Sequence, residues 1–406
     1  MLKKRGMSGI ILEKKELPKG IRVLTWSTSI RWFGWGLGEA FIPIFLLLFS
    51  ANLLETGILI SIYYITFFLF LPVSGFLADN AKAKKMILAS MLVYIFIGLG
   101  YFIAGVTGAV IFVIIVMGLN GISYSLDQVG RESYFIRHSP KKKVSSIFGH
   151  FDFITNFWWI VAVLVGFALV EYAKVQIYEL LFFIAPTSLI SFFVVLKLKE
   201  KGKKGAKSKI SPAIAYTKIF SETKNFNNGL KIVAMISFVS GILSSVIYYF
   251  VPISYYISGS SLVSAASLAL VYTIPYLLGN YLGKIADTKK EKTYLFGTSI
   301  LVLLLGLLIF SSNYFVLIGV MFFSSAIFEL IYLTNKGMIT RIAERAHVGE
   351  VDGSLNGIAA LGAVIGPVVF GLLFDVLGFA KAYMFMILIV ILALIVLIKE
   401  RKSLKN

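Results

Sequence analysis

The sequence has no cysteine, only three histidines and few charged residues. Without cysteine there are no disulfide bonds, thiolate metal sites or cysteine nucleophiles, and so few histidines nearly exclude a multi-histidine metal site. Charged residues make up 15% of the 406 residues, whereas soluble chains carry about a quarter. A soluble protein of this length would need a polar surface that this composition cannot supply. Soluble, secreted and disordered classes are therefore excluded.

Hydrophobic residues make up 58% of the chain and gather in about twelve apolar stretches. A helix needs about 20 apolar residues to cross a bilayer, and continuous rather than alternating hydrophobicity excludes a β-barrel. The sequence therefore predicts an all-α integral membrane protein with about twelve transmembrane helices. The predicted spans are residues 22–49, 54–78, 86–105, 108–130, 146–171, 176–197, 230–257, 262–286, 293–311, 313–335, 353–376 and 381–398.

Basic residues are distributed unevenly over the predicted loops. The net charge is +19, and 36 of the 39 Lys and Arg residues lie on one side of the predicted membrane, together with both termini. Only Lys174 and Lys381 lie on the opposite side, and Arg31 lies within the first span. Because basic loops stay in the cytoplasm, both termini are predicted to be cytoplasmic in a plasma-membrane protein. The charge favours anionic lipid at that face, and no motif points to nucleic acid.

Two polar segments recur at nearly the same spacing. Gly75-Phe-Leu-Ala-Asp79 ends the second span, Gly283-Lys-Ile-Ala-Asp287 ends the eighth at an offset of 208, and lysines follow both. Residues 137–149 and 341–353 match at an offset of 204. The repeat predicts two pseudo-symmetric six-helix halves. Their predicted bounds are 22–197 and 230–398, with a cytoplasmic tail at 1–21, a basic cytoplasmic linker at 198–229 and a second tail at 399–406.

The segment from Gly75 to Asp79, with its trailing lysines, resembles the loop 2–3 signature of the major facilitator superfamily of secondary transporters. The Gly366-Pro367 dipeptide of span 11 is similar to that family's Gly-Pro stretches. Met117 stands where drug–proton antiporters of the family usually carry an Arg, which weakens the antiporter interpretation. The resemblance covers nearly the whole chain, and it implies alternating access by a monomer.

The resemblance also implies a gate at the cytoplasmic side. Asp79, beside a tight turn that Gly75 permits, would contact the start of span 11 and a span 4 cation, for which Arg131 is the nearest candidate. By the repeat, Asp287 would face the start of span 5, with Lys336 as its cation. Alternatively, both Asp residues only cap helix ends. The predicted gating residues are Gly75, Asp79, Lys85, Arg131, Gly283, Asp287 and Lys336.

Several ionisable residues lie inside the predicted spans, where a central charge costs about 2.5–3.5 kcal/mol on insertion scales. Such a residue is usually retained for a partner or a function. A carboxyl group that lacks a full partner can carry a proton as the cavity alternates its opening. Hydrogen bonding to a neighbouring helix is the alternative for Glu39, and an i,i+4 ion pair with Arg131 is the alternative for Asp127. The proton-coupling candidates are Glu39, Asp127, Asp152 and Glu329.

Other polar and aromatic residues of the spans are candidates for the substrate cavity. Arg31 could bind an anionic group or neutralise Asp127 or Asp152, and tyrosines could stack on a sugar or an aromatic ligand. Packing and helix–helix hydrogen bonds are the alternatives for the tyrosines and asparagines. The cavity candidates are Arg31, Asn156, Tyr248, Tyr272, Tyr276 and Asn335.

The sequence thus predicts a secondary active transporter for a small solute, coupled to protons by symport or antiport. A facilitative uniporter of the same fold is one alternative, and a non-transporting membrane sensor is another. No constellation of catalytic residues indicates an enzyme, and no phosphate-binding loop indicates a primary pump. No metal or cofactor is predicted.

Overall fold

The computed structural model describes residues 18–80, 82–139, 144–199, 226–289, 292–342 and 348–404. Within these residues the chain is almost entirely helical, and no strand occurs. Ten of the described helices are long and apolar enough to cross a membrane, or up to twelve if each of two bent helix pairs counts as one span. The predicted all-α membrane fold is therefore confirmed. Most of the predicted linker at 198–229 lies outside the described residues.

The helices follow the predicted spans closely. In the first part of the chain they are α1 (Lys19–Glu39), α2 (Ile42–Leu48), α3 (Leu53–Asn80), α4 (Ala83–Thr107), α5 (Val110–His138), α6 (Val144–Ala173), α7 (Ile177–Phe182) and α8 (Ile184–Leu196). In the second part they are α10 (Asn228–Ile257), α11 (Leu262–Thr273), α12 (Gly279–Lys289), α13 (Lys292–Phe310), α14 (Tyr314–Ile342), α15 (Val348–Leu377) and α16 (Phe379–Lys399). Short 3-10 helices lie at η2 (Ile274–Leu278) and η3 (Arg401–Leu404).

Two of the predicted spans are bent. The first consists of α1 and α2, which meet at 50°, and the eighth bends by 65° between η2 and α12. Pro43 lies in the first turn of α2, just after the first bend, and Pro275 lies in the first turn of η2, just before the second. Proline has no N–H to donate and is tolerated best in a first turn. A proline therefore lies close to each bend, after the first and before the second.

Close packing divides the described residues into two units. Unit 1 comprises the described residues of 1–39 and 69–211, and unit 2 comprises those of 40–68 and 212–406. Helix α2 and the first part of α3 thus group with the later helices, and α3 is shared between the units. The division into two six-helix halves stays a prediction.

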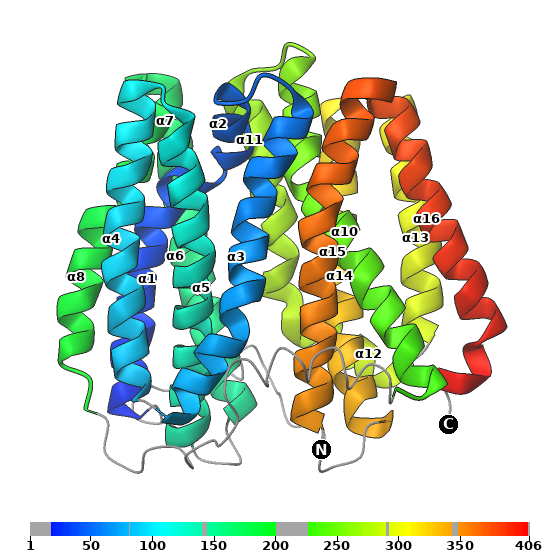
Figure 1. Ribbon diagram of the computed structural model, residues 1–406, viewed down its shortest axis with the longest axis horizontal. Helices are drawn as coiled ribbons and strands as arrows, with labels where there is room; N and C mark the ends of the chain where they lie inside the picture. The colour runs from blue at the N-terminus through cyan, green and yellow to red at the C-terminus, as the bar shows by residue number, and fades with distance from the viewer. Residues whose placement is uncertain are drawn as a thin grey trace, which may run out of the picture. The chain divides into compact units, whose positions relative to one another are not determined.

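Each unit is a bundle of helices (Figure 1). In unit 1, α1 packs against α6 and α8, and α4 packs against α5 and α8. In unit 2, α10 packs against α15, and α13 packs against α14 and α16. Helices α2 and α11 both contact α10.

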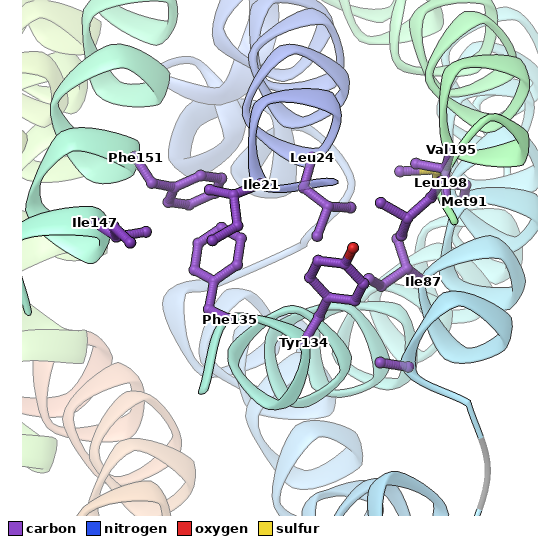
Figure 2. Packing of buried hydrophobic residues seen from close by; sticks show 11 residues of the cluster. Ile21, Leu24, Ile87, Met91, Tyr134, Phe135, Ile147, Phe151, Val195 and Leu198 are labelled. Atoms are coloured by element: carbon purple, nitrogen blue, oxygen red, sulfur yellow. The ribbon is translucent and has the colours of Figure 1, made fainter. Parts of the chain in front are cut away.

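A hydrophobic cluster joins five segments at one end of unit 1 (Figure 2). The rings of Phe135 from α5 and Phe151 from α6 meet edge to face, with centres 4.9 Å apart. The cluster continues to α8, and Lys84 donates hydrogen bonds to the carbonyls of Leu196, at the end of α8, and of Leu198, just after it. It fixes the helices that carry the buried charges described next. Its other labelled members are Ile21, Leu24, Ile87, Met91, Tyr134, Ile147 and Val195.

Candidate functional site

A buried ion pair connects α1 and α5 in unit 1. Nη2 of Arg31 lies 2.6 Å from Oδ2 of Asp127, and each residue is only 1% exposed. The same Oδ2 atom lies 3.5 Å from Nη2 of Arg131, one helical turn further along α5. Asp127 therefore sits between two guanidinium groups. The sequence left the partner of Arg31 open between Asp127 and Asp152, and the structure pairs it with Asp127.

Aromatic rings cover the two guanidinium groups. The Arg31 guanidinium carbon lies 4.5 Å from the centre of the Tyr94 ring, and that of Arg131 lies 5.9 Å from the Trp32 ring and 4.9 Å from the Phe151 ring. A cation over an aromatic face is attracted by the ring's negative charge, most strongly where water is excluded. The rings therefore offset part of the desolvation of the two arginines.

Hydrogen bonding in this network is incomplete. Nε of Arg31, Nη1 of Arg131 and Oδ1 of Asp127 are buried and have no hydrogen-bond partner within the described residues. Removing water from a polar group without replacing its hydrogen bond costs about 1–3 kcal/mol. The network therefore holds its charges by a few short contacts, and each partner depends strongly on the others.

Glu39 lies at the end of α1 and has a neutral partner. Its Oε2 accepts a hydrogen bond of 2.5 Å from Nε1 of Trp159 on α6. No Lys or Arg of the described chain lies within salt-bridge distance of Glu39. Glu39 thus differs from Asp127, because one acid is held by an indole and the other by two cations.

Of the remaining acids, Asp152 forms no ion pair within the described residues, although it is close enough to Arg131 for their charges to attract each other. Asp152 is exposed on α6, and its backbone carbonyl accepts a hydrogen bond of 2.8 Å from Asn156. Glu329 lies in unit 2 on α14, and its Oε1 is 3.7 Å from the position that a Cβ on Gly279 would take. Within unit 1 the structure therefore brings Arg31 together with Asp127.

The polar candidates of unit 2 make contacts between helices. The rings of Tyr248 and Tyr272 meet edge to face at 5.4 Å, whereas Tyr276 in η2 is 41% exposed. Asn335 on α14 accepts a hydrogen bond of 2.7 Å from the Tyr294 hydroxyl and donates one of 3.0 Å to Ser237. Asn335 therefore connects α10, α13 and α14, which is the helix–helix role that the sequence left open.

Among the predicted gating residues, Gly75 and Asp79 lie near the end of α3, whereas Arg131 lies inside α5, where it contacts Asp127. The tight turn predicted at Gly75 is wrong, because α3 runs unbroken from Leu53 to Asn80 and Gly75 does not have a positive φ. The residues after Gly75 include Leu and Ala, which favour a helix. The side chain of Asp79 lies outside the described residues, and Lys85 is exposed on α4.

The second copy of the motif lies at α12. Gly283 and Asp287 are both helical, and the Asp287 side chain is exposed. Oδ1 of Asp287 lies 3.9 Å from the position that a Cβ on Gly337 would take. Gly337 follows Lys336, whose ammonium lies 5.2 Å from the centre of the Tyr332 ring. The structure thus brings Asp287 to the part of α14 that carries its predicted cation.

Sequence reasoning missed three residues that hold these elements in place. Trp159 is the partner of Glu39, Arg137 on α5 donates a hydrogen bond to the Ala78 carbonyl near the end of α3, and Asp375 accepts two backbone N–H groups. A cation beside a helix C-terminus is favourable, so a basic residue close to the end of span 4 was a usable signal for Arg137. An isolated acid at the end of an apolar span was a usable signal for Asp375.

The described residues contain no group of three His, Asp or Glu side chains placed to hold a metal ion. Long apolar helices with charged side chains buried between them define a polytopic integral membrane protein. The chain belongs to the Major Facilitator Superfamily, whose family model matches residues 24–293 and, in a second match, residues 233–406. The resemblance found in the sequence is thereby confirmed, and the chain is assigned to a family of transporters. No curated protein matches the sequence.

Solved transporter structures share the fold. The nucleoside transporter NupG aligns with a TM-score of 0.73 at 13% identity, over 95% of this chain and 100% of that one. A bacterial homologue of the human lysosomal transporter Spinster, inward-facing and occupied, aligns with 0.72 at 12% identity over 94% and 96%. The human organic anion transporter MFSD10 aligns with 0.67 at 13% identity over 94% and 100%. At these identities the likeness shows the fold alone.

Proposed function

We propose that this transporter moves a small solute across the plasma membrane by alternating access and couples the movement to protons. The basic loops support a cytoplasmic location for both termini, and their positive charge favours anionic lipid at the cytoplasmic face. The protein works as a monomer of two six-helix halves, without a cofactor and without enzymatic activity. Asp79, Asp287 and the residues around them gate the cytoplasmic side.

Glu39 is the proposed proton carrier, and its contact with Trp159 carries the proposal. The indole N–H donates to a carboxylate oxygen, and it can also donate to the carbonyl oxygen of a protonated carboxyl group. Protonation of Glu39 therefore breaks no ion pair, because its hydrogen-bond partner is the neutral indole of Trp159. A group that changes protonation in every cycle needs surroundings that tolerate both forms.

Asp127 is in the opposite situation. Its protonation would leave Arg31 and Arg131 buried beside each other, with a neutral group where their shared carboxylate had been. An uncompensated buried charge is strongly destabilising. We therefore assign Asp127 an anchoring role, and Asp152 and Glu329 are the next candidates for the proton site.

The test is solute-driven proton movement in liposomes that contain the pure protein and a sealed pH dye. Pools of sugars, organic acids, amino acids and lipophilic cations are added outside, and we expect one pool to change the internal pH. Uptake of labelled solute without a pH change would contradict proton coupling and identify a uniporter. Thermal stabilisation by a solute that is not taken up would contradict transport and identify a sensor.

A further inference from the structure

The first turn of α3 is held by a carboxylate from a distant part of the chain. Leu53 N–H donates to Oδ1 of Asp375 at 3.0 Å, and Leu54 N–H donates to Oδ2 at 2.8 Å. Asp375 lies near the end of α15, and all three residues belong to unit 2. The contact therefore joins the start of one spanning helix to the end of another.

The start of α3 also has acceptors of its own. Oδ1 of Asn52 accepts the N–H of Glu55 at 2.8 Å, and Oε2 of Glu55 accepts the N–H of Ala51 at 2.8 Å. This pair resembles a capping box, except that Glu55 accepts from the residue before the N-cap Asn52. Of the N–H groups at the start of α3, the pair therefore satisfies that of Glu55 but not those of Leu53 and Leu54. Asp375 accepts these two remaining N–H groups, those of Leu53 and Leu54. Its contact thus completes the start of α3 and at the same time joins α3 to α15.

Below this contact the two helices meet backbone to backbone. A Cβ on Gly57 would lie 2.1 Å from the Pro367 carbonyl oxygen, and a Cβ on Gly371 would lie 2.5 Å from that of Leu53. The Ser61 hydroxyl donates to the Val364 carbonyl at 2.7 Å. Small residues allow such close approach between membrane helices. Surfaces of this kind can part and rejoin with little repacking of large side chains.

We propose that Asp375 is a positioning residue that latches α3 to α15 at the membrane face opposite the basic loops and releases when that face opens. Helix α3 ends at Asn80, before the basic segment, so its start lies at the other face. The Asp375 side chain is exposed, so water can replace both hydrogen bonds on release. The latch rests on the proposed alternating access.

The absence of cysteine makes a single engineered thiol a unique reporter. Ser61→Cys places it at the contact of α3 with Val364, where Ser61 is 6% exposed. Labelling by a membrane-impermeant maleimide is measured in the folded protein with and without Asp375→Asn. We expect labelling to become about three- to tenfold faster, as for loss of a helix cap. The control is Ser261→Ala, which removes the hydroxyl by which Ser261, the N-cap of α11, accepts the N–H of Ser264. Because this cap is local to α11, its loss should leave the labelling rate unchanged.

Equal labelling rates with and without Asp375→Asn would overturn the latch, as would an equal acceleration by Ser261→Ala. Asp375→Ser is the second variant, because its short hydroxyl can at most accept one N–H and should also accelerate labelling. Either Asp375 variant could melt below the assay temperature, and labelling is then measured at a lower temperature at which the variant is folded. An unchanged labelling rate there would show that Asp375 only stabilises the fold, and it would overturn the latch. Faster labelling in a protein that transports no solute would support the contact between α3 and α15 as a latch but contradict the proposed transport function. Failure of the latch and failure of the proposed function therefore give different results.

Discussion

Asp127→Leu is expected to destabilise the protein by about 3–5 kcal/mol, more than any other single change in the buried charge network. The change removes the carboxylate that Arg31 and Arg131 share, and breaking a buried ion pair by removing one partner has this magnitude. Two guanidinium groups would remain buried beside each other. Thermal unfolding in detergent, followed by size-exclusion chromatography, measures the loss.

The size of the effect should follow the geometry. Arg31→Met removes the contact of 2.6 Å, whereas Arg131→Met removes the contact of 3.5 Å. We therefore expect Asp127→Leu to be the most harmful change, Arg31→Met the next and Arg131→Met the least.

Two controls make this prediction specific. Lys85→Met removes an exposed cation on α4 and should change stability little, because exposed charges contribute little. The double change Asp127→Leu with Arg31→Met should be more stable than Asp127→Leu alone, because only one buried guanidinium then lacks a partner. An Asp127→Leu protein that melts at the temperature of the unchanged protein would contradict the ion-pair account.

Gly166→Ala and Gly241→Ala are expected to cost about 1–3 kcal/mol each through overpacking. A Cβ on Gly166 in α6 would lie 2.1 Å from the Leu37 carbonyl oxygen, and one on Gly241 in α10 would lie 2.0 Å from that of Ala359. The neighbouring atom in each case is backbone, so the helices must move apart to make room. Expression of folded protein and its melting temperature measure the effect.

Gly75→Ala and Gly283→Ala are the matched controls, because nothing described lies within 4 Å of an added Cβ at either position. Both glycines are helical, so alanine should stabilise the protein by about 0.5–1 kcal/mol. These residues belong to the predicted gating motif, and slower transport without lost stability would support that role. If all four variants had the same melting temperature, close approach of the helices would not explain why glycine occupies positions 166 and 241.

The fold could be predicted from the sequence because a bilayer imposes simple rules on it. Apolar stretches of the required length predicted the spans, whereas the orientation that the basic loops indicate stays a prediction. The breaks within spans 1 and 8 were not predicted, although Pro43 lies just after the first and Pro275 just before the second. Proline is common in membrane helices that stay continuous, as Pro72 does within α3. Proline alone therefore does not locate a break.

The site could be predicted only in part. An i,i+4 relation on α5 made contact between Asp127 and Arg131 predictable, because both lie on one helix face. The partners of Glu39 and Asp375 could not be found in this way, since Trp159 lies 120 residues from Glu39 and Leu53 lies 322 residues from Asp375. Such pairs depend on which helix faces meet. A single sequence shows that an acid inside a span needs a partner, but it does not show which residue is that partner.

Solute-driven proton movement in the Glu39→Gln protein tests the central claim most directly. Glutamine keeps the size of the side chain and a carbonyl oxygen for the Trp159 indole, but it does not take up a proton. Glu179→Gln, which alters an exposed acid in the cap of α7, is the control. We predict that the internal pH change is lost in Glu39→Gln and retained in Glu179→Gln, with both proteins folded. A full pH change in Glu39→Gln would contradict the claim and move the proton site to Asp152 or Glu329.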